Sequence, residues 1–410
     1  MAGGFQMVLE LFKTAARREK ILNKIINAAP ILFVLLGLGA CISEPLARNC
    51  VRIIFLIFFA ALCYRKFSLK DFTPYAKILF LMAAFLAWLM ISYALGGMKI
   101  PLGDDAIEWL AFSHNMIIFL PLAVLIREEK FLTAILTALG LSLMIDNAYI
   151  FWQAAQGVER PLTFLHGSIM QSTLLYIILL PAFLVMTLNE KATLPRRLFD
   201  GIIFFTSLAA CIMINTRGAW LDLAIVLPFI VAYRLRSRKK ILAAAVICVV
   251  LGGLFLAASP RTFNRLSTIA APTSEQSVSE RFLMWRSALS AIGDQPLTGV
   301  GFGNYEAAYR EKYISDEARE RFQGHAHNVY LQLWAEAGLP ALILFCGLFG
   351  YILYWSWRRA KNFYGLIIFA ATLDLMLYGL TDYTLSSFSA MRVYWLLFGV
   401  CLIGLRFKRA

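Results

Sequence analysis

The chain is poor in charged residues and in histidine. Only 16% of its 410 residues are charged and four are His, whereas 60% are apolar. Soluble domains usually carry about a quarter charged and half apolar residues. The shortage of charge therefore excludes a string of soluble globular domains, the expectation that length alone would give. We expect one membrane bundle with a single soluble excursion.

Paired cysteines are also lacking. All seven Cys lie within or beside apolar blocks and none forms a CxxC motif, so a zinc or redox site built on cysteine is not indicated. Cys41 and Cys50 lie near enough in the chain to meet at one loop, but the favoured interpretation is two small apolar residues. No cleavable signal peptide is recognisable. The basic residues among the first 24 predict a helix on the cytoplasmic face, followed by an uncleaved first span.

The net charge of +14 invites a nucleic-acid interpretation, but the distribution of charge argues against one. Most Lys and Arg residues cluster in short segments between apolar blocks, as in cytoplasmic loops beside anionic lipid. We therefore expect membrane lipid, and not nucleic acid, as the partner of these charges.

The apolar blocks predict an all-α integral membrane protein. Blocks of about 17–25 residues suit helices that cross the hydrocarbon layer, where backbone polar groups must be paired. We predict twelve spans, at residues 26–43, 50–64, 77–95, 112–126, 131–152, 169–188, 200–216, 219–233, 241–258, 329–355, 363–380 and 388–405. The excess of Lys and Arg in alternate loops predicts that both termini lie on the cytoplasmic side of the membrane.

Three parts follow from this pattern. Residues 1–258 form an N-terminal bundle of about nine spans, and residues 329–410 form a C-terminal segment of three spans. Between them, residues 259–328 form a long periplasmic loop. Loops of this length are usually functional or disordered, and helix signals within this one favour order.

The long loop contains a predicted amphipathic helix. Ser277-x-x-Glu280 resembles a capping box, and the residues from Arg281 to Ile292 have the pattern of a helix on the membrane surface. The run 293–296, Gly-Asp-Gln-Pro, should end it. The following Gly-x-Gly-x-Gly run at 299–303 lacks the strand-then-helix context of a phosphate-binding loop, so we interpret it as a turn.

Arg217 lies between two apolar blocks at the outer side. A charged residue there is a functional candidate, and a guanidinium group offers a rigid fork of donors suited to phosphate. An arginine that extends to lipid headgroups at a tight glycine turn is an equal alternative.

Arg281 and Arg286 are five residues apart, which places them on different faces of the predicted helix. Only one of them is expected to point into a site. For Arg286 we favour a solvated face.

Two of the four His, His325 and His327, lie where the long loop enters the tenth span. Asn328, Gln332 and Glu336 follow at intervals of four and form a polar stripe on one helix face. A neutral imidazole is a suitable general base, and His327 at the head of the stripe is the better candidate. A zinc site is conceivable, but His-x-His without further ligands nearby is a weak signal, so we expect no metal.

Other polar residues are weaker candidates. The outer acidic loop with Asp104, Asp105 and Glu108 resembles metal-binding loops of lipid-linked-sugar transferases, but a solvated loop is favoured. The other candidates are two isolated outer histidines, His114 and His166, and two acids inside spans, Asp146 and Asp374. Asp382 is an acid at the outer end of a span.

Three motifs, in this order and spacing, resemble the O-antigen ligase and O-antigen polymerase superfamily of bacterial inner membranes. The first is Thr216-Arg217-Gly-Ala-Trp-Leu. The second is Glu280-Arg281-Phe-Leu-Met-Trp with the glycine run at 299–303. The third is His327-Asn328-x-Tyr-Leu-Gln-x3-Glu-x-Gly.

The resemblance implies a GT-C-like fold and an O-antigen ligase that needs no metal or other cofactor. Such an enzyme moves O-antigen from undecaprenyl pyrophosphate to lipid A–core, with inversion at the donor carbon. Arg217 and Arg281 would hold the pyrophosphate and His327 would activate the acceptor hydroxyl. The supporting residues would be His325, Asn328, Gln332, Glu336 and Arg286. Pro340 stands where the family pattern has glycine, a minor departure.

Two other functions remain open. An O-antigen polymerase acts on the same carrier and shares outer arginines, so the motifs do not separate it from a ligase. A lipid-linked-oligosaccharide flippase, from a different class, would need ionisable groups near mid-membrane, for which Asp146 and Asp374 are the candidates. A purely structural scaffold fits poorly with Arg217 and His327.

Overall fold

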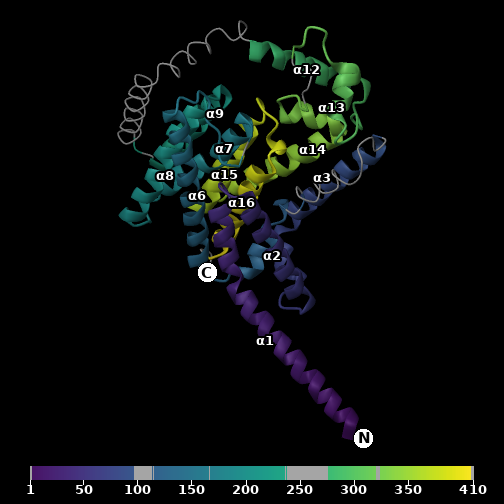
Figure 1. Cartoon of the computed structure of the whole chain (residues 1–410), viewed down its shortest axis with the longest axis vertical. Helices are drawn as coiled ribbons and strands as arrows, with labels where there is room; N and C mark the ends of the chain where they lie inside the picture. Colours follow the sequence, from purple (N-terminus) through teal and green to yellow (C-terminus); the bar gives the residue numbers. More distant parts are fainter. Residues whose placement is uncertain are drawn as a thin grey trace.

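The computed structural model describes residues 2–96, 113, 115–165, 167–235, 237, 276–319 and 324–407. Every regular element in these ranges is a helix (Figure 1). The helices are α1 (Ala2–Gly39), α2 (Glu44–Cys63), α3 (Ala76–Leu95), α5 (Phe119–Leu125), α6 (Glu129–Ala155), α7 (Ile169–Thr187), α8 (Leu194–Ile214), α9 (Arg217–Leu235), α12 (Gln276–Asp294), α13 (Tyr305–Ala308), α14 (Val329–Trp357), α15 (Phe363–Tyr378) and α16 (Phe388–Phe407). Short 3-10 or π turns lie at Leu69–Tyr75, Tyr309–Tyr313 and Thr384–Ser386.

The predicted fold class, an all-α integral membrane protein, is confirmed. Nine helices among the described residues are long and apolar enough to cross a membrane, and α15 is a shorter apolar helix. The predicted count of twelve stays a prediction. The span at 241–258 lies outside the described residues, and residues 112 and 114 of the span at 112–126 do so as well; the helix α5 within that span has seven residues.

The first helix differs from its prediction. We expected a surface helix over the first 24 residues and then a separate span, but α1 is one continuous helix from Ala2 to Gly39. Residues 5–29 contain no glycine or proline, so nothing in the chain interrupts the helix. The membrane-length part begins at Arg17.

The capping box predicted at Ser277 is wrong, because α12 begins at Gln276 and Ser277 lies inside it. Glu280 has a different contact. Its buried carboxylate accepts a hydrogen bond from the Arg319 backbone N–H at 3.1 Å and so ties α12 to the end of the long loop. The predicted end of the helix is confirmed, since α12 ends at Asp294.

Helices α7 and α16 form the centre of the bundle. Their most apolar windows are 83% and 89% buried, against 28% for α9. Helix α7 packs against α8, α9 and α15, and α16 packs against α5, α6 and α15. The remaining spans therefore surround two buried helices and turn exposed apolar faces outward, as expected in lipid.

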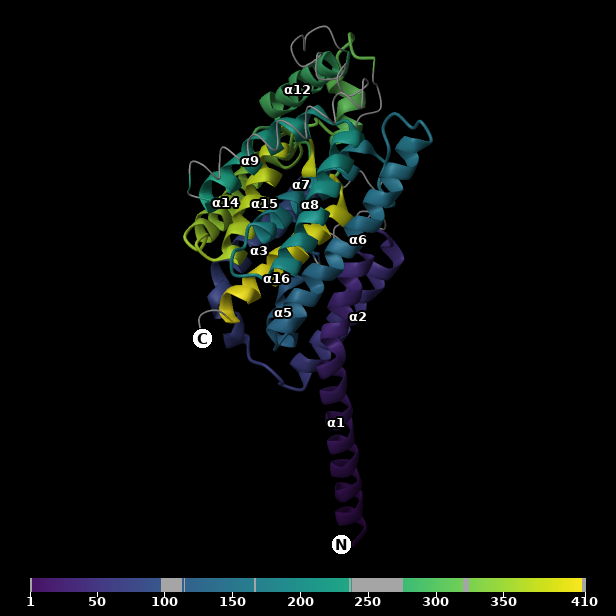
Figure 2. The same ribbon diagram turned by 90° about the vertical axis from the view of Figure 1, so that its left-hand side faces the viewer.

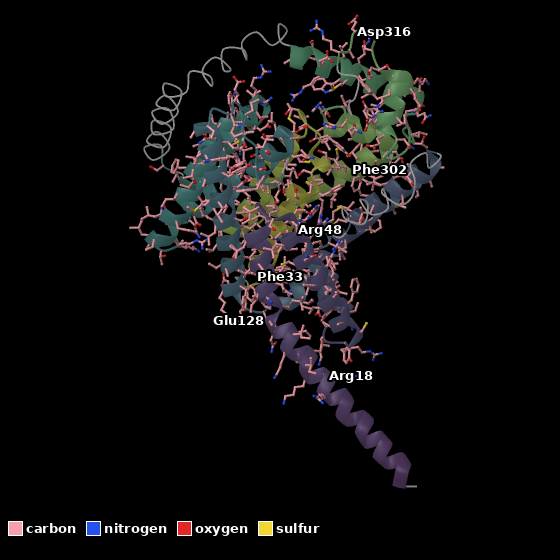
Figure 3. The ribbon with its side chains drawn as sticks, in the orientation of Figure 1. Arg18, Phe33, Arg48, Glu128, Phe302 and Asp316 are labelled. Atoms are coloured by element: carbon pink, nitrogen blue, oxygen red, sulfur yellow. The ribbon has the colours of Figure 1, made fainter. Side chains whose placement is uncertain are left out.

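The bundle has two distinct ends. Helices α12 and α13 lie at one end, which we call the α12 end, whereas α1 begins and α16 ends toward the other (Figures 1 and 2). Figure 3 shows Phe302 and Asp316 at the α12 end and Arg18 and Glu128 toward the opposite end. The two chain ends thus lie on one side of the bundle.

Helix α14 is broken at Gly338, whose backbone angles of φ 80° and ψ 173° are not helical. The break frees backbone groups that the loop at residues 296–303 then satisfies. The N–H of Val300 donates to the Ala335 carbonyl at 2.9 Å, and the N–H of Leu339 donates to the Pro296 carbonyl at 2.9 Å. Unpaired backbone groups are costly at membrane depth, so the break and the loop stabilise each other.

The same loop also docks on α3. The Ser92 hydroxyl donates to the Thr298 carbonyl at 3.0 Å and accepts from the Phe302 N–H at 3.1 Å. The interpretation of the Gly-x-Gly-x-Gly run as a turn is confirmed, because all three glycines have positive φ. A Cβ on Gly299 would overlap the backbone of Glu336, so glycine permits this close approach.

We predict that Gly338→Ala lowers the stability of the protein. The added Cβ would overlap the Leu297 carbonyl, and this φ/ψ region alone costs a non-glycine residue about 1–3 kcal/mol. The thermal unfolding midpoint in detergent is the measurement. Gly350→Ala in the same helix is the control, since its Cβ would meet nothing within 4 Å. Equal midpoints for the two variants would contradict the docking described above.

Candidate functional site

His327 and Asp382 meet at the α12 end. Their closest atoms, His327 Nδ1 and Asp382 Oδ1, are 3.3 Å apart, at the long end of hydrogen-bonding range. The same carboxylate oxygen accepts a 2.8 Å hydrogen bond from the Tyr383 N–H. Both side chains are largely buried, with 14% and 5% exposed. With its proton on Nδ1, the imidazole donates to Asp382 and leaves Nε2 free to accept a proton.

The N-cap of α14 places these two residues together. The side-chain oxygen Oδ1 of Asn328 accepts from the Tyr330 and Leu331 N–H groups, both at 3.0 Å. Its amide nitrogen donates to the Leu380 carbonyl at 3.0 Å. The start of α14 is thereby tied to the turn after α15, which carries Asp382.

Gln332 and Glu336 hold two separate loop segments. The side-chain oxygen Oε1 of Gln332 accepts a 2.8 Å hydrogen bond from the N–H of Ala326, the residue between the two histidines. Its amide donates to Glu336 at 2.9 Å, and Glu336 in turn accepts from the Gly303 N–H at 2.8 Å. The polar stripe predicted from the sequence therefore joins the histidine segment to the glycine turn.

His327 has a strained backbone. Its φ of 48° lies in the left-handed region, which is uncommon for residues other than glycine, although asparagine, aspartate and histidine enter it more often than most. Residues held in such conformations cluster at functional sites, where neighbouring contacts must impose them. Here the hydrogen bonds of Ala326 and Asn328 on either side fix the conformation.

His325 is the second imidazole of the site. Its ring centroid lies 4.4 Å from that of His327 and 5.8 Å from that of Tyr383. Burial, reinforced by the neighbouring His327, lowers the pKa of His325 to about 4, so this ring is neutral at ordinary pH. Burial acts to raise the pKa of Asp382, but the interactions with His327, with His325 and with the Tyr383 N–H together lower the pKa below its ordinary value. The pair thus joins an ionised carboxylate to an imidazole.

Asp382 is the site residue that sequence reasoning missed. It was noted only as an acid at the outer end of a span, and its partner His327 is 55 residues away in the chain. The expectation that no further ligand lies near the His-x-His motif is wrong, because the fold brings Asp382 to both histidines. One ligand atom each from His325, His327 and Asp382 lie within 4.8 Å of one another.

Arg281 approaches this group from α12. Its Nη2 atom lies 4.0 Å from the sulfur of Met170, which in turn lies 3.7 Å from the Tyr378 hydroxyl. The guanidinium charge also interacts with His325 and Tyr378. Arg286 is exposed, so the two arginines of α12 lie on different faces, as predicted.

Arg217 begins α9 beside the same turn. The connection from α8 is only two residues long and turns at Asn215, whose φ is 68°. A Cβ on Gly218 would lie 2.6 Å from the Thr381 hydroxyl, so the start of α9 packs against the residue that precedes Asp382. Arg217 is half-buried, and the positive end of the α9 dipole adds to its charge.

The two acids predicted inside spans, Asp146 and Asp374, are both buried. Asp146 is buried in α6 and accepts a 2.9 Å hydrogen bond from the Phe164 N–H. Asp374 is buried within α15. The other candidates lie outside the described residues: Asp104, Asp105, Glu108, His114 and His166.

Comparison with known proteins agrees with the three motifs. Residues 202–346 match the family model described as O-antigen ligase, a segment that includes Arg217, Arg281 and His327. This match confirms the resemblance found from the motifs.

Two relatives are each 25% identical to the chain. One is an uncharacterized protein of Haemophilus influenzae, aligned over 347 residues, 80% of this chain and 83% of the relative. The other is a ComP-specific O-oligosaccharyltransferase of Acinetobacter baylyi, aligned over 349 residues. That alignment covers 81% of this chain but only 56% of the relative.

We predict that His327→Gly is more stable than His327→Ala, by about 1 kcal/mol. Both variants lose the contact with Asp382, but only alanine keeps a Cβ at positive φ. In an unstrained position the usual order is the reverse. Thermal unfolding in detergent compares the two variants directly. An alanine variant as stable as the glycine variant would show that this backbone is not strained.

Proposed function

Because this chain is a glycan-transferring membrane enzyme with an O-antigen ligase domain, we propose that it is an O-antigen ligase. In this proposal the enzyme transfers polymerised glycan from undecaprenyl pyrophosphate to a sugar hydroxyl of lipid A–core, with inversion and without a metal. The observation that carries the proposal is the meeting of the His327–Asp382 pair with Arg281, beside the start of α9, at one end of the bundle.

We take the α12 end to be the periplasmic end. The chain ends lie toward the opposite side, where the basic N-terminal and C-terminal segments suit the cytoplasmic face of the inner membrane. Both lipid-anchored substrates can then reach the site from the outer leaflet.

The two arginines would serve the leaving group. When the bond between the donor sugar and the pyrophosphate breaks, its electron pair passes to the pyrophosphate and adds negative charge there. The guanidinium groups of Arg217 and Arg281 would match phosphate oxygens in a bidentate manner. Preorganised positive charge of this kind lowers the barrier most where water is excluded.

The His327–Asp382 pair would serve the acceptor. The Nε2 atom of neutral His327 takes the proton of the acceptor hydroxyl while that oxygen forms the new bond to the anomeric carbon. The Nδ1 proton stays toward Asp382, whose ionised carboxylate stabilises the imidazolium that results. Asp382 acts here as a positioning residue.

One specific observation favours a second acceptor class. The Acinetobacter baylyi relative is a ComP-specific O-oligosaccharyltransferase, so a protein hydroxyl is a second candidate acceptor for this chain. The donor, the base and the arginines would act in the same way, and only the acceptor would differ.

We predict that Arg217→Lys and Arg281→Lys each lower the transfer rate, by about 100-fold. Lysine keeps the charge but loses the planar fork, so the effect isolates geometry from charge. Transfer of a labelled donor to purified acceptor in detergent is the measurement. Arg286→Lys, on the exposed face of α12, is the matched control and should change the rate little. Equal effects at all three positions would contradict the proposed roles.

In the host, we predict that His327→Ala leaves core lipopolysaccharide without O-chains while polymer accumulates on its carrier. Gel profiles of lipopolysaccharide and of carrier-linked glycan provide the measurement. Single-unit chains on core would identify a polymerase, and loss of a glycoprotein with normal lipopolysaccharide would identify a protein acceptor. Normally capped lipopolysaccharide and normal glycoproteins would reject the catalytic role of His327. Product formation by purified protein excludes a purely transporting function.

A further inference from the structure

We propose that His325, His327 and Asp382 form a binding site for a divalent transition metal of the Zn²⁺ class, and that metal bound there blocks transfer. The binding part of the proposal stands on geometry alone. The blocking part rests on the proposed role of His327 as the base.

The geometry suits such an ion. The three ligand atoms lie within 4.8 Å of one another. Two ligands bound at 2.0–2.1 Å to a tetrahedral Zn²⁺ lie about 3.4 Å apart. The separation of 3.3 Å between His327 Nδ1 and Asp382 Oδ1 already matches that value. Small side-chain rotations would bring the His325 ring, 4.4 Å from that of His327 between centroids, into the same sphere.

The donor set also suits this class of metal. Two imidazoles and one carboxylate favour Zn²⁺ and related ions over Mg²⁺ or Ca²⁺, which prefer oxygen ligands. Three protein ligands leave a fourth position for water, as in open zinc sites. The backbone between the histidines is fixed by the hydrogen bond from Ala326 to Gln332, and Asp382 is fixed by the Tyr383 N–H. Such outer contacts orient metal ligands.

Nearby charges set the strength of binding. The positive charge of Arg281 acts on His325 and opposes a cation, whereas the carboxylate of Glu306 acts in the opposite sense. With only three protein ligands and a guanidinium group close by, we expect reversible binding, weaker than at structural zinc sites with four protein ligands.

Binding would remove the base. A metal on His327 Nδ1 requires the ring proton to move to Nε2, so the ring stays neutral and no proton is lost to solvent. Nε2 then carries a hydrogen and has no lone pair with which to accept the proton of the acceptor hydroxyl. The metal is therefore an inhibitor and not a cofactor.

The test of binding uses the full chain in detergent, stripped with EDTA and titrated with Co²⁺ alone. We expect one Co²⁺ per chain with visible absorption bands of a four-coordinate site, displaced by Zn²⁺. His325→Gln and Asp382→Asn should each weaken binding by at least about tenfold. His114→Ala and His166→Ala, which change the other two histidines of the chain, should not. Unchanged thermal midpoints show that the variants are folded.

Three outcomes would overturn the site. These are absence of four-coordinate bands, equal binding by the Asp382→Asn variant, or bands with the charge transfer typical of thiolate ligands. The last would assign the metal to exposed cysteines such as Cys63 or Cys346.

The test of inhibition adds Zn²⁺ to the transfer assay. Transfer should fall in proportion to occupancy of the site by Zn²⁺ and should return when EDTA is added. A reaction kept in EDTA from the start should proceed normally. Co²⁺ binding without inhibition by Zn²⁺ would leave the metal site in place and reject His327 as the base. If the wild type binds no Co²⁺ while His327→Ala is inactive, the metal site is rejected and the proposed function still holds.

Discussion

The break in α14 at Gly338 is the constraint on which the rest of the structure depends. A membrane helix has no spare backbone hydrogen bonds, so a polar loop has nothing to hold at its surface. The break provides such groups, and the glycine turn at 299–303 docks on them. Glu336 and Gln332, one turn apart, then join this turn to the segment that carries both histidines. The long loop is thus fixed at two points on one helix.

The contacts that fix the loop also hold two unfavourable features at the site, a positive φ and a buried carboxylate. His327 is held at positive φ, and its imidazole is held against a buried carboxylate. An ionised Asp382 in a largely buried position is tolerable because His327 and the Tyr383 N–H both bind it. The same arrangement that prepares an imidazole to take a proton also brings together three metal ligands. A metal bound to Nδ1 of His327 would therefore prevent the same ring from taking the proton of the acceptor hydroxyl at Nε2.

The sequence predicted the elements well and their meeting poorly. Hydrophobic blocks predicted α3, α6, α7 and α16 to within about three residues, because span length is fixed by the bilayer. The prediction failed for α1, because nothing in the chain separates a surface helix from a span. It also failed for the capping box at Ser277, because this local pattern lies inside a helix. Arg217, Arg281 and His327 were selectable because charge at a membrane boundary is costly. Asp382 could not be selected in this way, because it comes close to His327 only when the start of α14 packs against the turn after α15.

Both arginines and the His327–Asp382 pair would serve one pyrophosphate-linked donor. The most direct measurement is an experimental structure of the full chain with undecaprenyl pyrophosphate-linked glycan bound. We expect the pyrophosphate to lie between Arg217 and Arg281, with the anomeric carbon facing the side on which Nε2 of His327 lies. A pyrophosphate bound away from either guanidinium group, or an anomeric carbon that His327 and an acceptor cannot jointly reach, would contradict it.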